Sequence, residues 1–122
     1  MRYKASRKYR VCRRNDIDRI FSLNYHANDR LLTLRAAPNG LDYSRGGTAV
    51  ASDFGNAVRR NRVKRLCREA FRLCRPDLPT GWDFMLIPRR GAKVTLGGLK
   101  QSLTTLVGKA TDGKPSPKDE AP

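Results

Sequence analysis

The residues best suited to chemistry in this chain are the arginines and lysines between positions 59 and 75. Eight basic side chains lie in that segment against a single acid, Glu69. They are Arg59, Arg60, Arg62, Lys64, Arg65, Arg68, Arg72 and Arg75. A guanidinium donates paired hydrogen bonds to a phosphate and stacks on a base, so this composition indicates a polyanion-binding surface. The alternative, a solvated helix face, normally mixes Glu with Lys four residues apart.

The charge of the whole chain points the same way. The sequence has 26 Lys and Arg against 11 Asp and Glu, a net charge of +15 on 122 residues. Solubility alone requires far less, so we expect an acidic partner, either a nucleic acid or an anionic membrane surface. No apolar run approaches the roughly 20 residues that span a bilayer, and no apolar stretch follows the basic residues 1–8 as in a secretory signal. A mitochondrial transit peptide is the weaker alternative for that segment.

Other reactive residue types form no constellation that would support hydrolysis by the protein. His26 is the only histidine; it lies in a polar stretch and is expected to be solvated. Five aspartates are scattered through the predicted linkers and caps, without the spacing of paired carboxylates or metal ligands. They are Asp16, Asp18, Asp29, Asp42 and Asp53. We therefore expect no catalytic residue and no metal site in the protein itself.

The three cysteines, Cys12, Cys67 and Cys74, form neither a disulfide framework nor a zinc motif, because their number is odd and no CxxC pair occurs. On a helix, Cys67 and Cys74 would lie about 10 Å apart, too far for a disulfide. We expect small buried side chains in a reducing cytoplasm.

A long helix from about Asn56 to Arg75, ended by Pro76, must position the basic residues. On a helical wheel its apolar residues occupy an arc of about 160°. They are Val63, Leu66, Cys67, Ala70, Phe71, Leu73 and Cys74. Most basic residues, together with Asn61, fall on the opposite arc. Arg59 and Arg60 project to the apolar side of the first turn, so we expect a loosened turn or a cleft there, at a helix end that attracts phosphate.

The remaining pattern predicts an α+β single domain over residues 1–110. Asn15 or Asp16 caps a first helix that ends near Leu23, and a polar connector follows over 24–29. Strands are expected over 31–37, 47–51 and 82–87, with Trp82 in the core rather than exposed as a base-stacking platform. Thr95 caps a last helix, and residues 111–122 have the composition of a disordered tail. Two alternatives are open for Arg89, Arg90 and Lys93: they extend the basic surface, or they are simply solvated.

The run Arg60-Asn61-Arg62-Val63-Lys64-Arg65, within the string from Gly55 to Arg72, resembles the signature of the bacterial ribonuclease P protein family. The helix Asn15–Phe21, the Arg89–Gly91-Ala92 step and the Leu99–Leu103 helix occur in the order that the family shows. The resemblance covers roughly residues 8–110. It implies a four-stranded sheet with three helices in αβββαβα order and a left-handed βαβ crossover. A fourth strand is then expected between Leu34 and Ala51.

The resemblance also implies a function. In this family a large RNA is the catalyst, binds the Mg²⁺ ions and removes the 5′ leader of precursor tRNA, and the protein is its non-catalytic, cytoplasmic cofactor. The partners implied are that catalytic RNA and precursor tRNA, with no membrane and no required protein partner. The residues implied to bind the catalytic RNA are Arg59, Arg60, Asn61, Arg62, Lys64, Arg65, Arg68 and Arg72. Those implied to form the leader cleft are Ile17, Phe21, Arg35 and Asn56.

The sequence departs from the family pattern at that cleft. Ile17 and Arg35 stand where the family often has aromatic residues, although a guanidinium can also stack. Ser52-Asp53 replaces a frequent Lys-Lys pair. We therefore expect leader binding that is weaker or differently distributed. The alternatives to this function are a ribosomal or DNA-binding module that uses the basic helix structurally, and, with a poorer fit, a helix bound to an anionic membrane.

Overall fold

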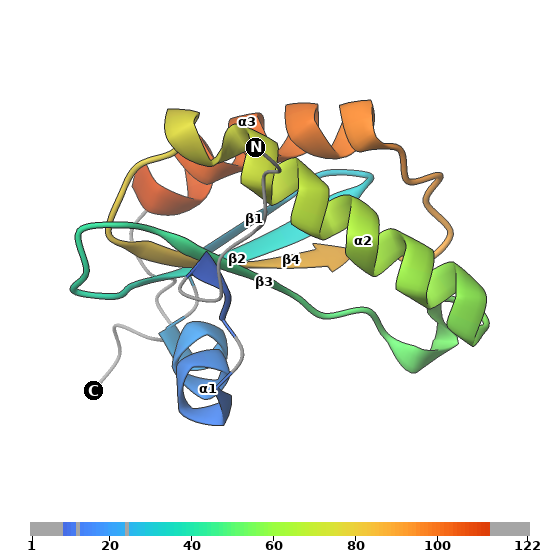
Figure 1. The fold of residues 1–122 in the computed structure, drawn as a ribbon, viewed down its shortest axis with the longest axis horizontal. Coiled ribbons are helices and arrows are strands. Elements are labelled where there is room, and N and C mark those ends of the chain that lie inside the picture. The colour runs from blue at the N-terminus through green and yellow to red at the C-terminus, as the bar shows by residue number, and fades with distance from the viewer. Residues whose placement is uncertain (1–8, 12, 24, 113–122) are drawn as a thin grey trace, which may run out of the picture.

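A mixed four-stranded sheet separates two helices on one face from a single helix on the other (Figure 1). The computed structural model describes residues 9–11, 13–23 and 25–112. Its elements, in chain order, are α1 (Arg14–Leu23), β1 (Tyr25–Asn28), β2 (Leu32–Pro38), β3 (Arg45–Thr48), the 3-10 turn η2 (Ser52–Phe54), α2 (Ala57–Cys74), the 3-10 turn η3 (Arg75–Asp77), β4 (Trp82–Pro88) and α3 (Leu96–Asp112). The αβββαβα order predicted from the resemblance is confirmed.

The strand order in the sheet is β1-β2-β4-β3. The pairs β1–β2 and β2–β4 are antiparallel, whereas β3 and β4 are parallel neighbours joined through α2. In Figure 1, β3 and β4 run from left to right, α2 returns above them, and β3 lies on the near side, beneath α2. This geometry makes the crossover left-handed, against the general preference for right-handed connections.

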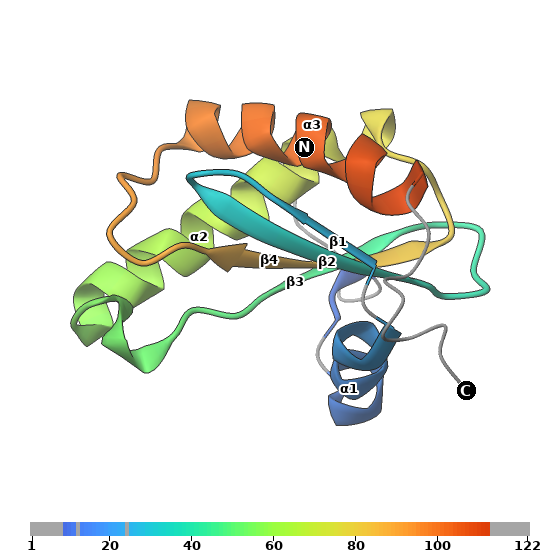
Figure 2. The ribbon, with the colours of Figure 1, turned by 180° about the vertical axis from the view of Figure 1, so that it is seen from behind.

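The main core fills the space between the sheet and the helices α2 and α3 (Figure 2). Leu34, Phe84 and Leu86 point into it from the strands, and Leu99 and Leu103 from α3; all are at most 1% exposed. Alternate strand residues point to the opposite face. There, Met85 and Ala37 pack against Ile20 of α1 in a smaller core. Most of the apolar burial therefore fixes α2 and α3, while little of it holds α1.

The fourth strand is β1, so the prediction that it lies between Leu34 and Ala51 is wrong. The prediction of a polar connector over residues 24–29 is also wrong, because β1 occupies that segment. β1 is an edge strand whose residues alternate between half-buried and exposed. Only Tyr25 and Ala27 pack on the core, which leaves the segment polar in composition. Asp29 closes the hairpin, because its Oδ1 accepts hydrogen bonds from the backbone N–H groups of Leu31 (2.8 Å) and Leu32 (2.9 Å).

Two other boundaries differ from the prediction at their N-terminal ends. β3 begins at Arg45, two residues before the predicted start at 47. Gly46 and Gly47 belong to the strand, and Phe71 and Val11 pack closely against them. α1 begins at Arg14, before the predicted caps Asn15 and Asp16. The carboxylate of Asp16 lies in the first turn instead and faces arginine side chains.

At the C-terminal end, α3 continues through Thr111 and Asp112, two residues beyond the predicted domain boundary. The rest of the predicted tail lies outside the described residues. At the start of the same helix the predicted cap is confirmed, since Thr95 Oγ1 accepts a hydrogen bond of 3.1 Å from the backbone N–H of Gly98.

Candidate nucleic-acid interface

The basic helix α2 is amphipathic in the way that its sequence predicts. Asn56 caps it, with Oδ1 accepting from the backbone N–H of Arg59 at 2.9 Å. The residues buried on the core side are Val63, Cys67, Ala70, Phe71 and Cys74. Leu66 is only half-buried, and Leu73 is 38% exposed, so the packed arc is narrower than the wheel predicts. Packing along this arc fixes the orientation of the opposite face.

That opposite face forms a shallow depression along the helix. Its residues follow helical spacing and come from successive turns. They are Val58, Asn61, Lys64, Arg65 and Arg68, here called the outer face. No acidic side chain lies among them, and Val58 is 77% exposed, an apolar residue within a cationic surface. Four predicted RNA-binding residues are thus brought together on one rigid element.

The predicted residues Arg59 and Arg62 lie on a second side of α2, toward the loop after β4. They line a hollow with Lys93 of that loop. The guanidinium carbon of Arg59 is 5.9 Å from the ring centre of Phe54. Of the two alternatives for Lys93, the hollow favours extension of the basic surface, because it places this lysine next to both arginines. The basic surface is therefore wider than the helix alone.

The other two predicted arginines make contacts within the protein. Arg60 Nη1 donates to the carbonyl oxygens of Ser52 (3.0 Å) and Gly55 (3.1 Å), which fixes the turn η2 against α2. Arg72 donates to both carboxylate oxygens of Glu69, at 3.0 and 2.5 Å. These hydrogen bonds hold the pKa of Glu69 below its ordinary value. The geometry of both arginines is therefore set by protein groups.

The first turn of α2 contains no acid and two arginines. The N-terminal end of a helix is already positive, so each cation there costs roughly 0.3–1 kcal/mol. A protein optimised only for stability would place Asp or Glu at these positions. The arrangement favours anion binding at the expense of fold stability.

The predicted leader-cleft residues do not all lie together. Phe21 of α1 is 39% exposed, and the guanidinium carbon of Arg35 in β2 is 5.2 Å from its ring centre. Ile17 is half-buried in the smaller core beside them. Asn56 caps α2, whose first turn lies away from α1 in both views (Figures 1 and 2). Only Ile17, Phe21 and Arg35 therefore form one candidate surface.

A buried ionic cluster, here called the Asp83 network, fastens α1 to the sheet. Asp83 of β4 is 0% exposed and accepts hydrogen bonds from Arg19 of α1, Arg45 of β3 and Asn39 of the turn after β2. Asp16 of α1 lies 3.4 Å from Arg45. Burial alone raises the pKa of Asp83, but the hydrogen bonds from Arg45 and Asn39 and the charge of Arg45 outweigh it, so the pKa is lowered.

Asp83 was not among the predicted site residues, although its sequence context carries a signal. An acid inside an apolar strand, in Trp82-Asp83-Phe84-Met85, must find partners when it is buried. A second missed contact involves Asp53, one of the residues that departs from the family pattern. Arg90 Nη1 lies 2.5 Å from its Oδ2, so the turn η2 is tied to the loop after β4.

The burial of the histidine, the cysteines and the tryptophan can be compared with the predictions from sequence. His26 is exposed, as predicted; Cys67 and Cys74 are buried free thiols, as predicted, and Cys12 lies outside the described residues. Trp82 is half-buried and packs on Tyr25 and Phe84. Among residues 9–11, 13–23 and 25–112, no three His, Cys, Asp or Glu side chains gather as a metal site would require. Within the same residues, none of the helices has the length and apolarity to cross a bilayer.

The fold and the outer face together define a small basic RNA-binding protein with a single α+β domain. A model of the family described as Ribonuclease P matches residues 5–111. The ribonuclease P protein component of Thermotoga petrophila is 39% identical over 85 residues, which cover 70% of this chain and 73% of that protein. That of Brevibacillus brevis is 39% identical over 92 residues, covering 75% and 73%. The chain belongs to the ribonuclease P protein family.

Solved structures of relatives have the same fold. The ribonuclease P protein of Thermotoga maritima superposes with a TM-score of 0.71 at 33% identity, covering 79% of this chain and 92% of that one. The Staphylococcus aureus protein gives a TM-score of 0.71 at 29% identity, covering 82% and 93%. The family predicted from the Arg60–Arg65 run is therefore confirmed, and with it a partnership with the RNA of ribonuclease P.

Proposed function

We propose that this protein docks on the catalytic RNA of ribonuclease P through the outer face of α2, and that it assists removal of the 5′ leader from precursor tRNA. The observation that supports this most strongly is the outer face itself, where Asn61, Lys64, Arg65 and Arg68 converge without an acid on a helix fixed by its buried side. The RNA is the catalyst and holds Mg²⁺ in this proposal. The protein acts in the bacterial cytoplasm.

The protein would contribute electrostatics and substrate contact. Its excess of cations reduces repulsion between RNA phosphates, so the RNA folds and binds Mg²⁺ at lower salt. The surface of Ile17, Phe21 and Arg35 would contact the single-stranded leader, with Phe21 and Arg35 as stacking groups. Such contacts tolerate variable leader sequences because every base has a stacking face. Docking and leader contact then occupy opposite faces of the sheet.

Reversal of charge on α2 tests docking. We expect the triple variant Arg62→Glu, Arg65→Glu and Arg68→Glu to lose association with the catalytic RNA and to lose cleavage of precursor tRNA at low Mg²⁺. The exposed lysines of α3 give a control, Lys100→Glu with Lys109→Glu, which changes charge on another helix. Association of the triple variant at moderate salt as strong as that of the wild type would contradict the proposal. Stronger selection among DNA duplexes than for this RNA would favour the DNA-binding alternative.

Leader contact has its own test. Phe21→Ala should weaken binding of precursor tRNA that has a leader by about tenfold, as expected for loss of one stacked base, and leave mature tRNA unaffected. Equal losses for both substrates would assign Phe21 a structural role instead.

A further inference from the structure

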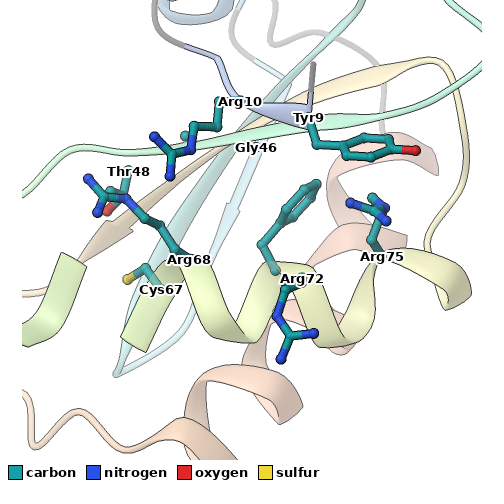
Figure 3. Close-up of a pocket in the computed structure, with 10 residues that line it drawn as sticks. Tyr9, Arg10, Gly46, Thr48, Cys67, Arg68, Arg72 and Arg75 are labelled. Atoms are coloured by element: carbon teal, nitrogen blue, oxygen red, sulfur yellow. The ribbon is translucent and has the colours of Figure 1, made fainter. Parts of the chain in front are cut away.

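A second basic recess lies behind the outer face, between the N-terminal segment, β3 and α2 (Figure 3). Here it is called the N-terminal pocket. Its cavity volume is about 40 Å³, and the empty space reaches about 420 Å³ only when the open solvent at its mouth is included. Its floor is apolar and consists of Gly46, Gly47, Cys67 and Phe71, and its rim includes Arg10, Arg68 and Arg75. The proposed docking by the outer face of α2 does not account for this recess.

Two glycines in β3, which line the pocket, allow close packing on both faces of that strand. Arg10 forms a parallel bridge with Gly46, and the backbone N–H of Val11 donates to the Gly46 carbonyl at 3.0 Å. A Cβ on Gly46 would lie 2.7 Å from the Phe71 ring, and one on Gly47 would lie 2.9 Å from the Val11 carbonyl oxygen. Because neither glycine has a side chain, helix and N-terminal segment approach the same strand from two sides.

Two of the rim arginines, Arg10 and Arg68, converge without an acid to balance them. In Figure 3 the side chains of Arg10 and Arg68 point toward the same end of the pocket, beside Thr48, whereas Arg72 points away and pairs with Glu69. No carboxylate among the described residues forms an ion pair with Arg10 or Arg68. Two like charges held together gain from an anion placed between them.

Two further contacts shape the pocket for a ligand. At the other end, Arg75 lies 3.5 Å from the ring centre of Tyr9, and Tyr9 packs edge-on against Tyr43 at 5.6 Å, so this wall is fixed. Near the arginines, Thr48 Oγ1 is buried without a hydrogen-bond partner, and the group beside it is the Cys67 thiol, a weak donor.

We propose that the N-terminal pocket binds one unpaired nucleotide of the catalytic RNA, with its base on the apolar floor and its phosphate between Arg10 and Arg68. This inference rests on the proposed docking function and adds a specific subsite to it. Arg68 belongs to both the outer face and the pocket rim, so an RNA strand on α2 passes the pocket mouth. A paired base is held in its helix and cannot enter, whereas an unpaired base can turn outward.

Chemical probing of bases in the reconstituted particle tests the proposal, at protein concentrations that saturate the RNA. We expect the protein to protect an unpaired base that becomes reactive again with Arg10→Gln plus Arg68→Gln. The control is Arg13→Gln plus Arg65→Gln, which also removes one charge from the N-terminal segment and one from α2, outside the pocket. The pocket variant should lose at least about tenfold more RNA affinity than the control, as expected for two charge-assisted hydrogen bonds.

A variant that fills the pocket without changing its charge distinguishes loss of the binding space from loss of the arginine charges. Thr48→Met fills the space with no change in charge and should expose the same base; thermal melting confirms that each variant is folded. If the wild type binds the RNA and every protected base stays protected in both pocket variants, the subsite is wrong while docking stands. If the wild type does not bind the RNA, the docking function itself fails. If inorganic phosphate displaces a nucleoside monophosphate at equal concentration, the base does not enter the pocket and the proposal is overturned.

Discussion

Arg45 and Asp83 face each other as a two-point ion pair, with Nε to Oδ1 at 2.8 Å and Nη2 to Oδ2 at 2.6 Å. The pair joins the neighbouring strands β3 and β4 beneath α1. Arg19 of α1 reaches the same carboxylate at 2.6 Å and also donates to the Pro38 carbonyl. Since the apolar core below α1 is small, this polar contact decides where α1, and with it Phe21, lies on the sheet.

Removal of the Asp83 charge should destabilise the protein strongly. Asp83→Asn leaves two arginines facing a neutral group at a fully buried position, and breaking such a pair costs about 3 kcal/mol. Urea unfolding measures the change. Asp18→Asn is the control, because its pair with Arg14 is solvent-exposed and its loss should cost less than about 0.5 kcal/mol. Similar effects of both variants would show that the network does not hold α1.

The same carboxylate predicts a pH dependence. The pKa of Asp83 in the folded protein lies below its ordinary value, so the folded state binds fewer protons than the unfolded state as the pH falls. The contribution of Asp83 is complete above the unfolded pKa of about 3.9, and is lost as the pH falls through the lower folded pKa. The stability difference between wild type and Asp83→Asn should be constant from neutral pH to about pH 5 and shrink below pH 4. A difference that grows on acidification would refute this assignment.

Val58 offers a test of whether α2 sacrifices stability for binding. Val58→Glu places an acid in the first turn of α2 at a position 77% exposed, and should raise stability by about 0.3–1 kcal/mol through the helix dipole. The same change puts a negative charge into the outer face and should weaken RNA binding. Val58→Gln is the control: it removes the apolar side chain without adding a negative charge, so the difference between the two variants gives the effect of the charge on stability and RNA binding. Gains in both stability and RNA affinity would show that the outer face is not the docking surface.

Features set by local sequence could be predicted. The apolar spacing along α2 and the Thr95 cap of α3 depend on residues within one or two turns, and the structure has both. The side chain of Arg60 could not be placed in this way, because it bonds to backbone carbonyls of a preceding turn whose shape the sequence does not specify. Eight RNA-binding residues were predicted, with only Arg59 and Arg60 set apart by the wheel, whereas the outer face contains four of the eight.

Features that depend on distant partners were missed. β1 lacks an apolar pattern because it is an edge strand, and its pairing with β2 is what defines it. Asp83 meets Arg19, Asn39 and Arg45, which are remote in sequence and have no shared spacing. Of the residues predicted for a leader cleft, Phe21 and Arg35 do lie together, whereas Asn56 has a local capping role.

Cys67 should be chemically inert in the folded protein. Burial raises the pKa of its thiol to about 11, so the reactive thiolate is almost absent at neutral pH. In a Cys12→Ser background, the native protein should react with iodoacetamide far more slowly than the same protein in guanidinium chloride. Mass spectrometry identifies the modified residue. Rapid alkylation of native Cys67 would mean that the base of the N-terminal pocket opens readily to solvent.

Gly46 should be indispensable for the contact between α2 and β3. A methyl group there would lie 2.7 Å from the Phe71 ring, which is itself only 6% exposed and has little room to move. Gly46→Ala should therefore destabilise the protein by about 1–3 kcal/mol, as overpacking of a core does. Gly40→Ala is a poor control because Gly40 has a positive φ of 72°, so Gly97→Ala in α3, where nothing lies within 4 Å, serves instead.

A second substitution distinguishes the clash from a general need for glycine in β3. Phe71→Leu removes ring atoms from the contact and should itself destabilise the core, yet in the Gly46→Ala background part of that cost should disappear. A double-mutant cycle measured by urea unfolding gives the coupling, expected at about 0.5–3 kcal/mol for residues in contact. If the two destabilisations are strictly additive, Gly46 is required for the strand backbone and not for its contact with Phe71. The close packing of α2 on β3 would then contribute nothing to stability.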